Sequence, residues 1–522
     1  MSDDANTLAA GHDYVTDVPY LRTFSNDLSP ASLRCAAALN GFAPPPAHDF
    51  DYLELGCGNG DTLITLAAAY PQGRFVGIDL NASHIAFARE LADRVHVDNV
   101  RFLHGDFEDL PQGDLQGLDY VTMWGLLSWI SPHKRKAAIE LAGARLKDGG
   151  IVFASYNTMP GWSAVEPFRR LMLDSAGTEG GSLDRAHRGL SVAKLLSDAG
   201  AQYFANNPAA KKMVATSIEN GLPYVVHEYF HADWHPMYFE DLAREMAASG
   251  IYFVGQMPLF CNYRDLVIPA SLLPLFNGVT DRVAFERLKD YAINEFFRRD
   301  VYMKGGRTRS DDTTRSFLDA TQFGTLMDAD QVKRRVQLPN YSLDYVGPIF
   351  EMLIPALAEQ AQSVAELAKS PALASYGHKQ IRDAVLHLAL GEQVVPMQQP
   401  VARSKPLTQG SFRATTEHNR TVLEQPLTHG ALVVLACPAT GTGVVLSAVQ
   451  VVCIRALGVQ PSHREQWLRA LVDAHPMKLH AEGRAVEETE AQVKMLAYEV
   501  GLFAEKRLPK LIQLGLLEQT PE

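Results

Sequence analysis

The sequence predicts an α/β fold whose core is a parallel, doubly wound sheet, and three observations support this. Five short apolar runs with strand character alternate with helical patterns in the first third of the chain. Three closely spaced glycines follow the first run, and acidic residues end the second and third runs at Asp79 and Asp106. Parallel strands end at one edge of a sheet. The glycines and both carboxylates are therefore expected side by side, where such sheets bind ligands.

The first strand and its glycine loop lie in the stretch Tyr52 to Gly60, YLELGCGNG, which precedes a helical pattern. Such a turn places backbone N–H groups and the N-terminus of the helix against a ligand. A dinucleotide-binding loop reads G-x-G-x-x-G, whereas this loop reads E-x-G-x-G-x-G from Glu54 onward. That spacing is similar to the motif of class I methyltransferases, which bind S-adenosylmethionine. The alternative is that the glycines only close a tight turn.

The remaining strands are expected at residues 74–80, 100–107, 118–124 and 149–156. Asp79, at the end of the second strand, can accept hydrogen bonds from two ribose hydroxyls. At the end of the third strand, Asp106 can take an adenine amino proton and Phe107 can lie against the ring. A ligand is therefore expected across the carboxyl ends of the strands.

Several further pieces carry a family resemblance: YVTDVPY at 14–20, G-x-x-S-W at 125–129, SYNTMPGW at 155–162 and HEYF at 227–230. Together they resemble bacterial class I methyltransferases that carry a methyltransferase regulatory domain. That family includes the rickettsial protein-lysine methyltransferases of outer-membrane proteins. The resemblance covers residues 12 to 310 and becomes faint beyond them.

The resemblance implies S-adenosyl-L-methionine as the cofactor and a set of residues that bind it. These residues are Tyr14, Tyr20, Glu54, Gly56, Cys57, Gly58, Gly60, Asp79, Leu80, Asp106, Phe107 and Trp124. Trp124 is a departure, because the family pattern has histidine before the glycine at this point. Whatever that histidine does in the family is therefore not carried over.

The acceptor is expected beside the cofactor, and a lysine side chain sets a chemical requirement there. Its pKa of about 10.4 must be overcome at neutral pH, which costs on the order of 5 kcal/mol through desolvation or transfer of the proton to a base. His227 or Glu228 is expected to receive the proton. Aromatic walls are expected to hold the amine by cation–π attraction, from Trp129, Tyr156, Trp162 and Tyr229. For each aromatic residue the alternative is ordinary core packing.

His227, Glu228 and His231 also spell H-E-x-x-H, the zinc-peptidase motif. The surrounding run PYVVHEYF is rich in β-branched and aromatic residues, so it is interpreted as a strand. On a strand the two imidazoles would stand about 13 Å apart, too far to bind one metal ion. No metal site is therefore predicted.

Composition narrows the function classes. A net charge of −12 argues against nucleic-acid binding, which needs a basic surface. Five cysteines without a C-x-x-C pair fit free thiols in the cytoplasm, and the acidic N-terminus has no secretory signal. The uncharged run 431–454 is long enough to span a bilayer, but PATGTG interrupts it. It is interpreted as a buried strand, a turn and a buried helix.

The length of 522 residues indicates several domains. They are expected as follows: an N-terminal lid at 1–46; the methyltransferase core at 47–162 and 223–265; a helical insertion at 163–222 that caps the substrate; a helical region at 266–340; a winged-helix-like regulatory module at 341–400; and a mixed C-terminal domain at 401–522. The amphipathic run 281–304 lies where the resemblance implies self-association, so a homodimer is expected.

Three functions remain open from the sequence. The first is methylation of lysine side chains in a protein, which the resemblance extends to a surface or outer-membrane protein before export. The second is the same chemistry on a small molecule. The third is a non-catalytic protein that keeps the nucleotide fold, although the intact Glu54, glycines, Asp79 and Asp106 speak against it.

Overall fold

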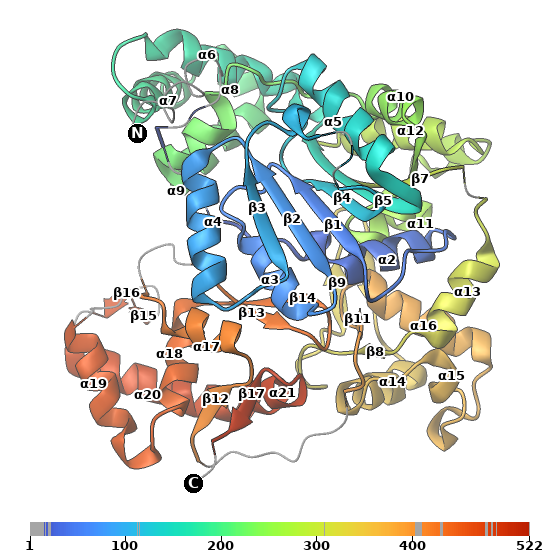
Figure 1. Cartoon of the computed structure of the whole chain (residues 1–522), viewed down its shortest axis with the longest axis vertical. Coiled ribbons are helices and arrows are strands. Elements are labelled where there is room, and N and C mark those ends of the chain that lie inside the picture. The colour runs from blue at the N-terminus through green and yellow to red at the C-terminus, as the bar shows by residue number, and fades with distance from the viewer. Residues whose placement is uncertain are drawn as a thin grey trace.

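The computed structural model describes residues 15, 17–18, 22–111, 113, 115–306, 308–401, 410–427, 432–474, 479–481, 484–486 and 488–520. Its centre is a seven-stranded sheet with the order β3-β2-β1-β4-β5-β7-β6 (Figure 1). The strands are β1 (Asp51–Leu55), β2 (Arg74–Asp79), β3 (Val100–His104), β4 (Leu118–Met123), β5 (Leu146–Asn157), β6 (Ile251–Gln256) and β7 (Phe297–Lys304). The first five strands pair in parallel, which confirms the doubly wound sheet.

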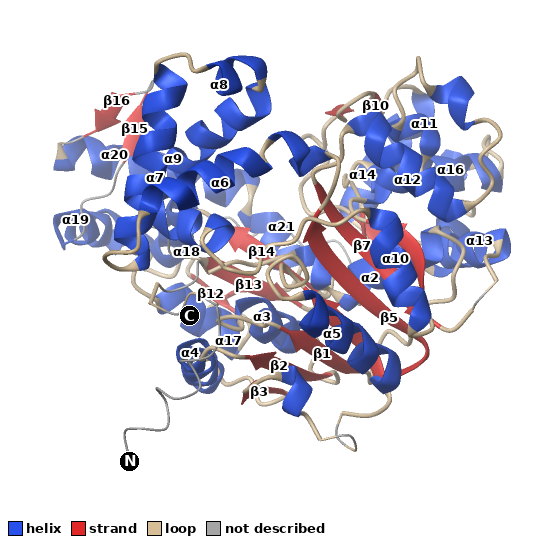
Figure 2. Ribbon diagram, turned by 90° about the horizontal axis from the view of Figure 1, so that it is seen from above, coloured by secondary structure: helices blue, strands red, loops and turns tan. Residues whose placement is uncertain are grey.

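Strand β7 corrects the prediction that 266–340 is a helical region outside the core. It lies between β5 and β6 and runs antiparallel to both. Figure 2 shows it beside β5. The strand was not predicted because its charged residues interrupt the apolar pattern expected of a buried strand. Arg298 is fully buried and pairs with Glu286 (2.8 Å) and Asp290 (2.5 Å) of α12 (Arg282–Ile293), and with Asp300 of β7 (3.0 Å). Buried charges are tolerated when they are paired in this way.

Both faces of the sheet are covered, so its strands read as apolar runs. Tyr52, Tyr120 and Phe153 face one side, while Leu53 and Val121 face the other. The first side packs against α2 (Pro30–Leu39), α3 (Asp61–Ala69) and α4 (Ala82–Arg94). The second side packs against α5 (Pro132–Arg145) and α10 (Phe239–Ala248). Helix α2 is thus part of the core, although the sequence placed it within a lid.

A helical insertion follows β5 and has a core of its own (top left in Figure 1). Its elements are η4 (Gly161–Ala164), α6 (Glu166–Ala176), α7 (Ser182–Asp198), α8 (Gln202–Asn206) and α9 (Pro208–Tyr229). The run PYVVHEYF is mostly helical up to Tyr229, so its interpretation as a strand was wrong. Val225, Val226 and Tyr229, at helical spacing, are fully buried in this core, and that packing outweighs the β propensity of the residues. Gly221, with φ 82° and ψ 172°, interrupts α9.

The polypeptide between the sheet and the C-terminal domain forms a second small lobe with its own apolar core. The elements from β6 to its end are η5 (Leu259–Asn262), α11 (Arg264–Val267), η6 (Leu273–Phe276), α13 (Asp311–Ala320), β8 (Phe323–Gly324), β9 (Arg335–Gln337), β10 (Ser342–Asp344), α14 (Pro348–Glu359), α15 (Val364–Leu367), η7 (Pro371–Leu373), α16 (His378–Leu390) and β11 (Val395–Pro396). The three helical runs expected after residue 345 are present. The likeness to a winged helix stays a prediction.

The C-terminal domain is mixed. Its elements are β12 (Phe412–Ala414), α17 (Glu417–Glu424), β13 (Val433–Cys437), β14 (Thr442–Leu446), α18 (Ala448–Leu457), η8 (Pro461–His463), α19 (Arg464–Ala474), β15 (Leu479–Ala481), β16 (Arg484–Val486), α20 (Thr489–Lys506), α21 (Leu508–Gln513) and β17 (Leu517–Gln519). The run 431–454 therefore contains two strands before its helix, where one was expected. Among the described residues, no helix has the length and apolarity needed to cross a membrane.

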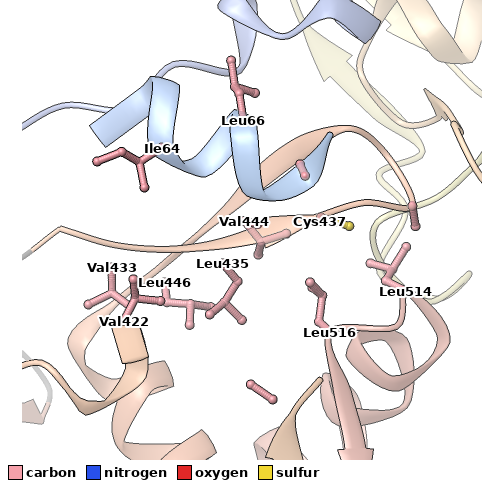
Figure 3. Close-up of a cluster of buried hydrophobic side chains, with 14 of the residues drawn as sticks. Ile64, Leu66, Val422, Val433, Leu435, Cys437, Val444, Leu446, Leu514 and Leu516 are labelled. Atoms are coloured by element: carbon pink, nitrogen blue, oxygen red, sulfur yellow. The ribbon is translucent and has the colours of Figure 1, made fainter. Parts of the chain in front are cut away.

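The C-terminal domain packs directly on α3, one of the helices that cover the central sheet (Figure 3). Ile64 and Leu66 of α3 lie over the hairpin β13–β14, in one buried cluster with Leu435 and Val444. The side chain of Asn26, in η2 (Asn26–Leu28), forms two hydrogen bonds with the backbone of Gly443 in the same hairpin (2.9 and 3.1 Å). The hairpin is therefore coupled by packing to the helix that begins at the glycine loop.

Candidate active site

A cavity of about 360 Å³ opens at the carboxyl ends of the parallel strands, where the strand order reverses between β1 and β4. This is the position at which doubly wound sheets bind ligands, and the volume suits a small organic molecule. The predicted site residues that line it are Glu54, Gly56, Cys57, Gly58, Gly60, Asp79, Leu80, Asp106, Phe107, Trp124, Trp129, His227 and Glu228. Tyr14 and Tyr20 lie outside the described residues.

The glycine loop is fixed to the neighbouring strand by backbone hydrogen bonds. The N–H groups of Gly56 and Cys57 donate to the carbonyl oxygen of Ile78 (2.8 and 3.1 Å). The N–H of Gly58 donates to Oδ2 of Asp79 (2.9 Å), so the carboxylate that ends β2 also holds the loop. Gly58 has a φ of 53°, a conformation that favours glycine.

The walls of the cavity fit S-adenosylmethionine. A Cβ atom added at Gly58, Gly105 or Gly125 would meet nothing within 4 Å, so at these points backbone borders open space and a ligand can approach it closely. The carboxylates of Glu54 and Asp79 stand beside this backbone. They would hold the hydroxyl and ammonium groups of the ligand.

The cavity is acidic. Its carboxylates are Glu54, Asp61, Asp79, Asp106, Glu228 and Asp233. Glu54 is only 4% exposed, and burial, with a further contribution from the charge of Asp79, raises its pKa to about 8. Asp61 is paired with Arg22 (2.6 Å), and Lys134 pairs with Asp106. Asp79 and Asp233 have no Arg or Lys partner among the described residues, so they are the groups that attract cationic ligands to the cleft.

Lys134 is a site residue that the sequence did not reveal. It lies in the first turn of α5, where Ser131 caps the helix, and also contacts Glu108 at 3.0 Å. Asp106 itself stands beyond β3, not at its end, and accepts a hydrogen bond from the N–H of Glu108 (3.1 Å). No local pattern connects Lys134 with a carboxylate 28 residues earlier. Other lining residues that were not predicted from the sequence are Thr23, Asn59, Asp61, Thr62, Ile78, His84, Gly105, Gly125, Leu126, Ile130, Tyr224, His231 and Asp233.

The N-terminal segment contacts two residues of the cavity lining, His227 and His231. His227 Nε2 donates to the carbonyl oxygen of Val18 (3.0 Å), and the N–H of Val15 donates to His231 Nδ1 (3.4 Å). Farther along, the ion pair between Arg22 and Asp61 joins the segment to α3. The segment thus contacts both the helical insertion and α3, the helix that follows the glycine loop. Its role as a lid stays a prediction.

Glu228 stands on the cavity wall formed by the insertion. Its Oε1 accepts a hydrogen bond from Nδ2 of Asn157 (3.4 Å), at the end of β5. Burial raises the pKa of this carboxyl to about 8, against an ordinary value of 4.5, and the hydrogen bond from Asn157 opposes that rise. Trp129 and Tyr224 line the same cavity.

Three of the predicted acceptor-pocket aromatics belong to the core, not to the lining of the cavity. Tyr156 is fully buried and its hydroxyl donates to Oδ2 of Asp300 (2.6 Å). Trp162 stacks on Phe296, with ring centroids 4.3 Å apart. Tyr229 packs edge-on against Phe168 in the insertion core, with ring centroids 5.5 Å apart. Aromatic residues are common in binding sites, but these three side chains pack inside the protein.

His227 and Glu228 of the H-E-x-x-H motif lie on a helix and not on the predicted strand, so the distance of about 13 Å expected between the two imidazoles was wrong. The helix ends at Tyr229, so His231 lies beyond it, and the two imidazole centroids are 5.9 Å apart. Burial and nearby positive charge lower the pKa of His231 to about 3. Across the described part of the chain, no group of three or more His, Cys, Asp or Glu residues is arranged to hold a metal ion.

Comparison with protein families gives two matches. A methyltransferase domain matches residues 53–150, and a predicted methyltransferase regulatory domain matches residues 222–304. The second region contains α10, β6, α12 and β7, together with the part of α9 that carries Glu228. In this chain it therefore completes both the sheet and the cavity wall.

Similar proteins come from cyanobacteria and rickettsiae. An uncharacterized protein of Synechocystis, sll1526, is 28% identical over 514 residues, which are 96% of this chain and 99% of that protein. An uncharacterized protein of Rickettsia prowazekii, RP789, is 26% identical over 298 residues, 55% of this chain and 52% of that protein.

A solved structure extends the likeness to the whole fold. The structure of PKMT2 from Rickettsia typhi in complex with AdoHcy covers 96% of this chain and 100% of its own, with a TM-score of 0.72 and 17% identity. The match to a methyltransferase domain, the order of the strands, the glycine loop and the cavity beside it all indicate the same class of enzyme. The chain is a class I, S-adenosylmethionine-dependent methyltransferase that carries a methyltransferase regulatory domain.

Proposed function

We propose that the enzyme methylates the side-chain amine of lysine residues in a protein. The observation that carries this proposal is Glu228, a carboxyl with a raised pKa in the wall of the cavity that also contains the glycine loop. The resemblance of the sequence to a family that includes protein-lysine methyltransferases supports the same acceptor.

The chemistry of an amine acceptor explains why such a carboxyl is useful. Bound S-adenosylmethionine supplies a methyl group on a sulfonium. A lysine ammonium has no lone pair to attack it and must first lose a proton. A carboxyl with the ordinary pKa of 4.5 would accept that proton at a cost of about 8 kcal/mol, because the two pKa values differ by about 6 units. With a pKa of about 8, the cost falls to about 3 kcal/mol.

The surroundings of Glu228 suit a cationic side chain. Of the six acidic side chains that line the cavity, Asp79 and Asp233 have no Arg or Lys partner among the described residues, and their negative charge attracts the lysine ammonium before it is deprotonated. The ring of Trp129 borders the same space and offers a cation–π contact. We assign the proton to Glu228, because its carboxyl lines the cavity and has a raised pKa.

The nature of the protein partner and the assembly rest on the resemblance. We propose that the acceptor is a surface or outer-membrane protein that is methylated in the cytoplasm before export, and that the enzyme acts as a homodimer. The half-exposed stacked pair of Tyr238 and Tyr291, with ring centroids 6.5 Å apart, supports a partner on that face. Light scattering coupled to gel filtration tests the dimer, and the mass of a single chain would contradict it.

The test of the acceptor chemistry is Glu228→Gln, which keeps the shape and removes the base. Methyl transfer should fall by the order of 10², which is typical of a positioned proton-transfer group, while the affinity for S-adenosylhomocysteine stays within about twofold. The deficit should shrink as pH rises, because more of the amine is then already neutral. Glu245→Gln is the matched control, since Glu245 pairs with Arg135 (2.8 Å) outside the cavity lining. Equal activity of both variants would refute the role of Glu228.

A further inference from the structure

The two sequence runs that carry the family resemblance most specifically, 125–129 and 155–162, are bonded to each other below the cavity. The hydroxyl of Ser155 accepts a hydrogen bond from the N–H of Gly125 (2.8 Å). The hydroxyl of Ser128 accepts one from the N–H of Asn157 (2.9 Å). Both bonds join the segment that follows β4 to the last residues of β5, so the two runs support each other.

Two hydrogen bonds hold the backbone of Asn157. It is 2% exposed, its N–H is bound to Ser128, and its carbonyl oxygen accepts a hydrogen bond from the N–H of Met237 (3.0 Å). Its side-chain amide then donates to Glu228, 71 residues later (3.4 Å). Asn157 is not among the lining residues of the cavity, so it contacts the carboxyl from behind.

Three titratable groups beside Glu228 have pKa values far from neutral. On the same helix, burial and the charge of Glu228 raise the pKa of Tyr224 to about 12, and the pKa of Tyr229 is raised as well. His231, with a pKa lowered to about 3, is neutral as well. Nε2 of His227 donates to the carbonyl oxygen of Val18, and Trp129, which also lines the cavity, carries no charge. More distant carboxylates of the cavity include Asp233 and Glu54.

We propose that Asn157 is a positioning residue for methyl transfer: its side-chain amide holds the Glu228 carboxylate in the orientation in which it takes the proton of the acceptor amine. This inference rests on the proposed function of Glu228. It gives the side-chain amide of Asn157, in the SYNTMPGW run, a role beyond packing. It also explains why that run is bonded to the G-x-x-S-W run, since both fix the backbone of Asn157.

Loss of the hydrogen bond from Asn157 should change the pKa of Glu228 in a known direction. An N–H donor stabilises the charged form of a carboxyl, so its removal raises the pKa of Glu228 above the present value of about 8. Asn157→Ala should shift this pKa upward by about one unit. Asn157→Asp keeps the shape of the side chain but places a second carboxyl beside the first, and repulsion between the two should raise the pKa at least as much.

The pKa can be read without any substrate. Infrared titration of the protonated-carboxyl band in the purified full chain, with the spectrum of Glu228→Gln subtracted, isolates Glu228 from Glu54. We expect a midpoint near pH 8 in the wild type and about one unit higher in Asn157→Ala and Asn157→Asp. Transfer of labelled methyl groups to lysate proteins should fall about tenfold at pH 7 in both variants and recover toward pH 9.

A structural asparagine serves as the control. Asn99 donates through Nδ2 to the carbonyl oxygens of Ala67, Tyr70 and Gly73 (2.9–3.1 Å), away from the cavity lining. Asn99→Ala should lower stability and leave the Glu228 midpoint unchanged. An unchanged midpoint in the isosteric Asn157→Asp would overturn the inference. A shifted midpoint together with a fully active Glu228→Gln would instead sustain the contact and refute the proposed function.

Discussion

Asp79→Ala is the substitution that tests ligand binding most directly, because the carboxylate of Asp79 both holds the glycine loop and borders the cavity. Oδ2 accepts a hydrogen bond from the N–H of Gly58 in the glycine loop, and Oδ1 accepts one from the N–H of Asn81, both at 2.9 Å. The side chain is 11% exposed and borders the cavity. Its removal therefore deprives the loop of an anchor and the ligand of a charged acceptor.

The expected loss follows from these bonds. Hydrogen bonds to a charged acceptor contribute about 1.5–3 kcal/mol, so the affinity for S-adenosylhomocysteine should fall about 10- to 150-fold. The result should lie in the upper half of this range, since the N–H of Gly58 also loses its partner. Titration calorimetry of the purified protein without added metal measures this change.

Asp119→Ala is the matched control for this experiment. Asp119 is also buried, accepts a hydrogen bond from the N–H of Asp51 (3.0 Å) and pairs with Lys147 (2.8 Å), but it lies at the opposite end of β4. This variant should lose stability and keep its affinity for the ligand. Unchanged affinity in Asp79→Ala, or an equal loss in the control, would refute the assignment of Asp79.

Four further predictions follow from the same geometry. Gly58→Val puts a branched side chain at a φ of 53° facing the cavity, so ligand binding should vanish while circular dichroism is unchanged; retained binding would mean that the loop is only a turn. Glu54 has a pKa raised from 4.5 to about 8, so its stabilising effect is full at low pH and is lost as pH rises through this window, by about 1.4 kcal/mol per pH unit. Glu54→Gln should flatten the dependence of unfolding free energy on pH, and an unaltered slope would contradict that pKa. Tyr156→Phe should cost about 1–3 kcal/mol of stability in urea titrations, because Asp300 loses a buried donor, with activity retained; loss of activity in a stable variant would return Tyr156 to the site. Leu435→Ala in the hairpin below α3 should cost about 2–5 kcal/mol, and a smaller loss would mean that this interface contributes little to folding.

The features that could be predicted from sequence are those that neighbouring residues determine. The glycine loop, the carboxylate of Asp79 and the parallel strands each occupy a few consecutive positions. The ligand site then follows, because parallel strands bring their ends together. The general resemblance of the chain to methyltransferases was visible for the same reason.

The features that sequence missed depend on contacts between distant residues. Strand β7 contains Arg298 and Asp300, and only the partners on α12 make their burial favourable. The run around His227 has β propensity, yet it is helical because one face of it closes the insertion core. The contact between Asn157 and Glu228 likewise joins residues 71 positions apart.

Transfer of a labelled methyl group tests the central claim most directly. The purified enzyme is incubated with lysate proteins and S-adenosylmethionine that carries a trideuterated methyl group, and peptides are analysed by mass spectrometry, with Gly58→Val as the inactive control. We expect trideuteromethyl groups on lysine ε-nitrogens with the wild-type enzyme and none with the variant. Label found only on small molecules or on other side chains, or equal labelling by the variant, would contradict it.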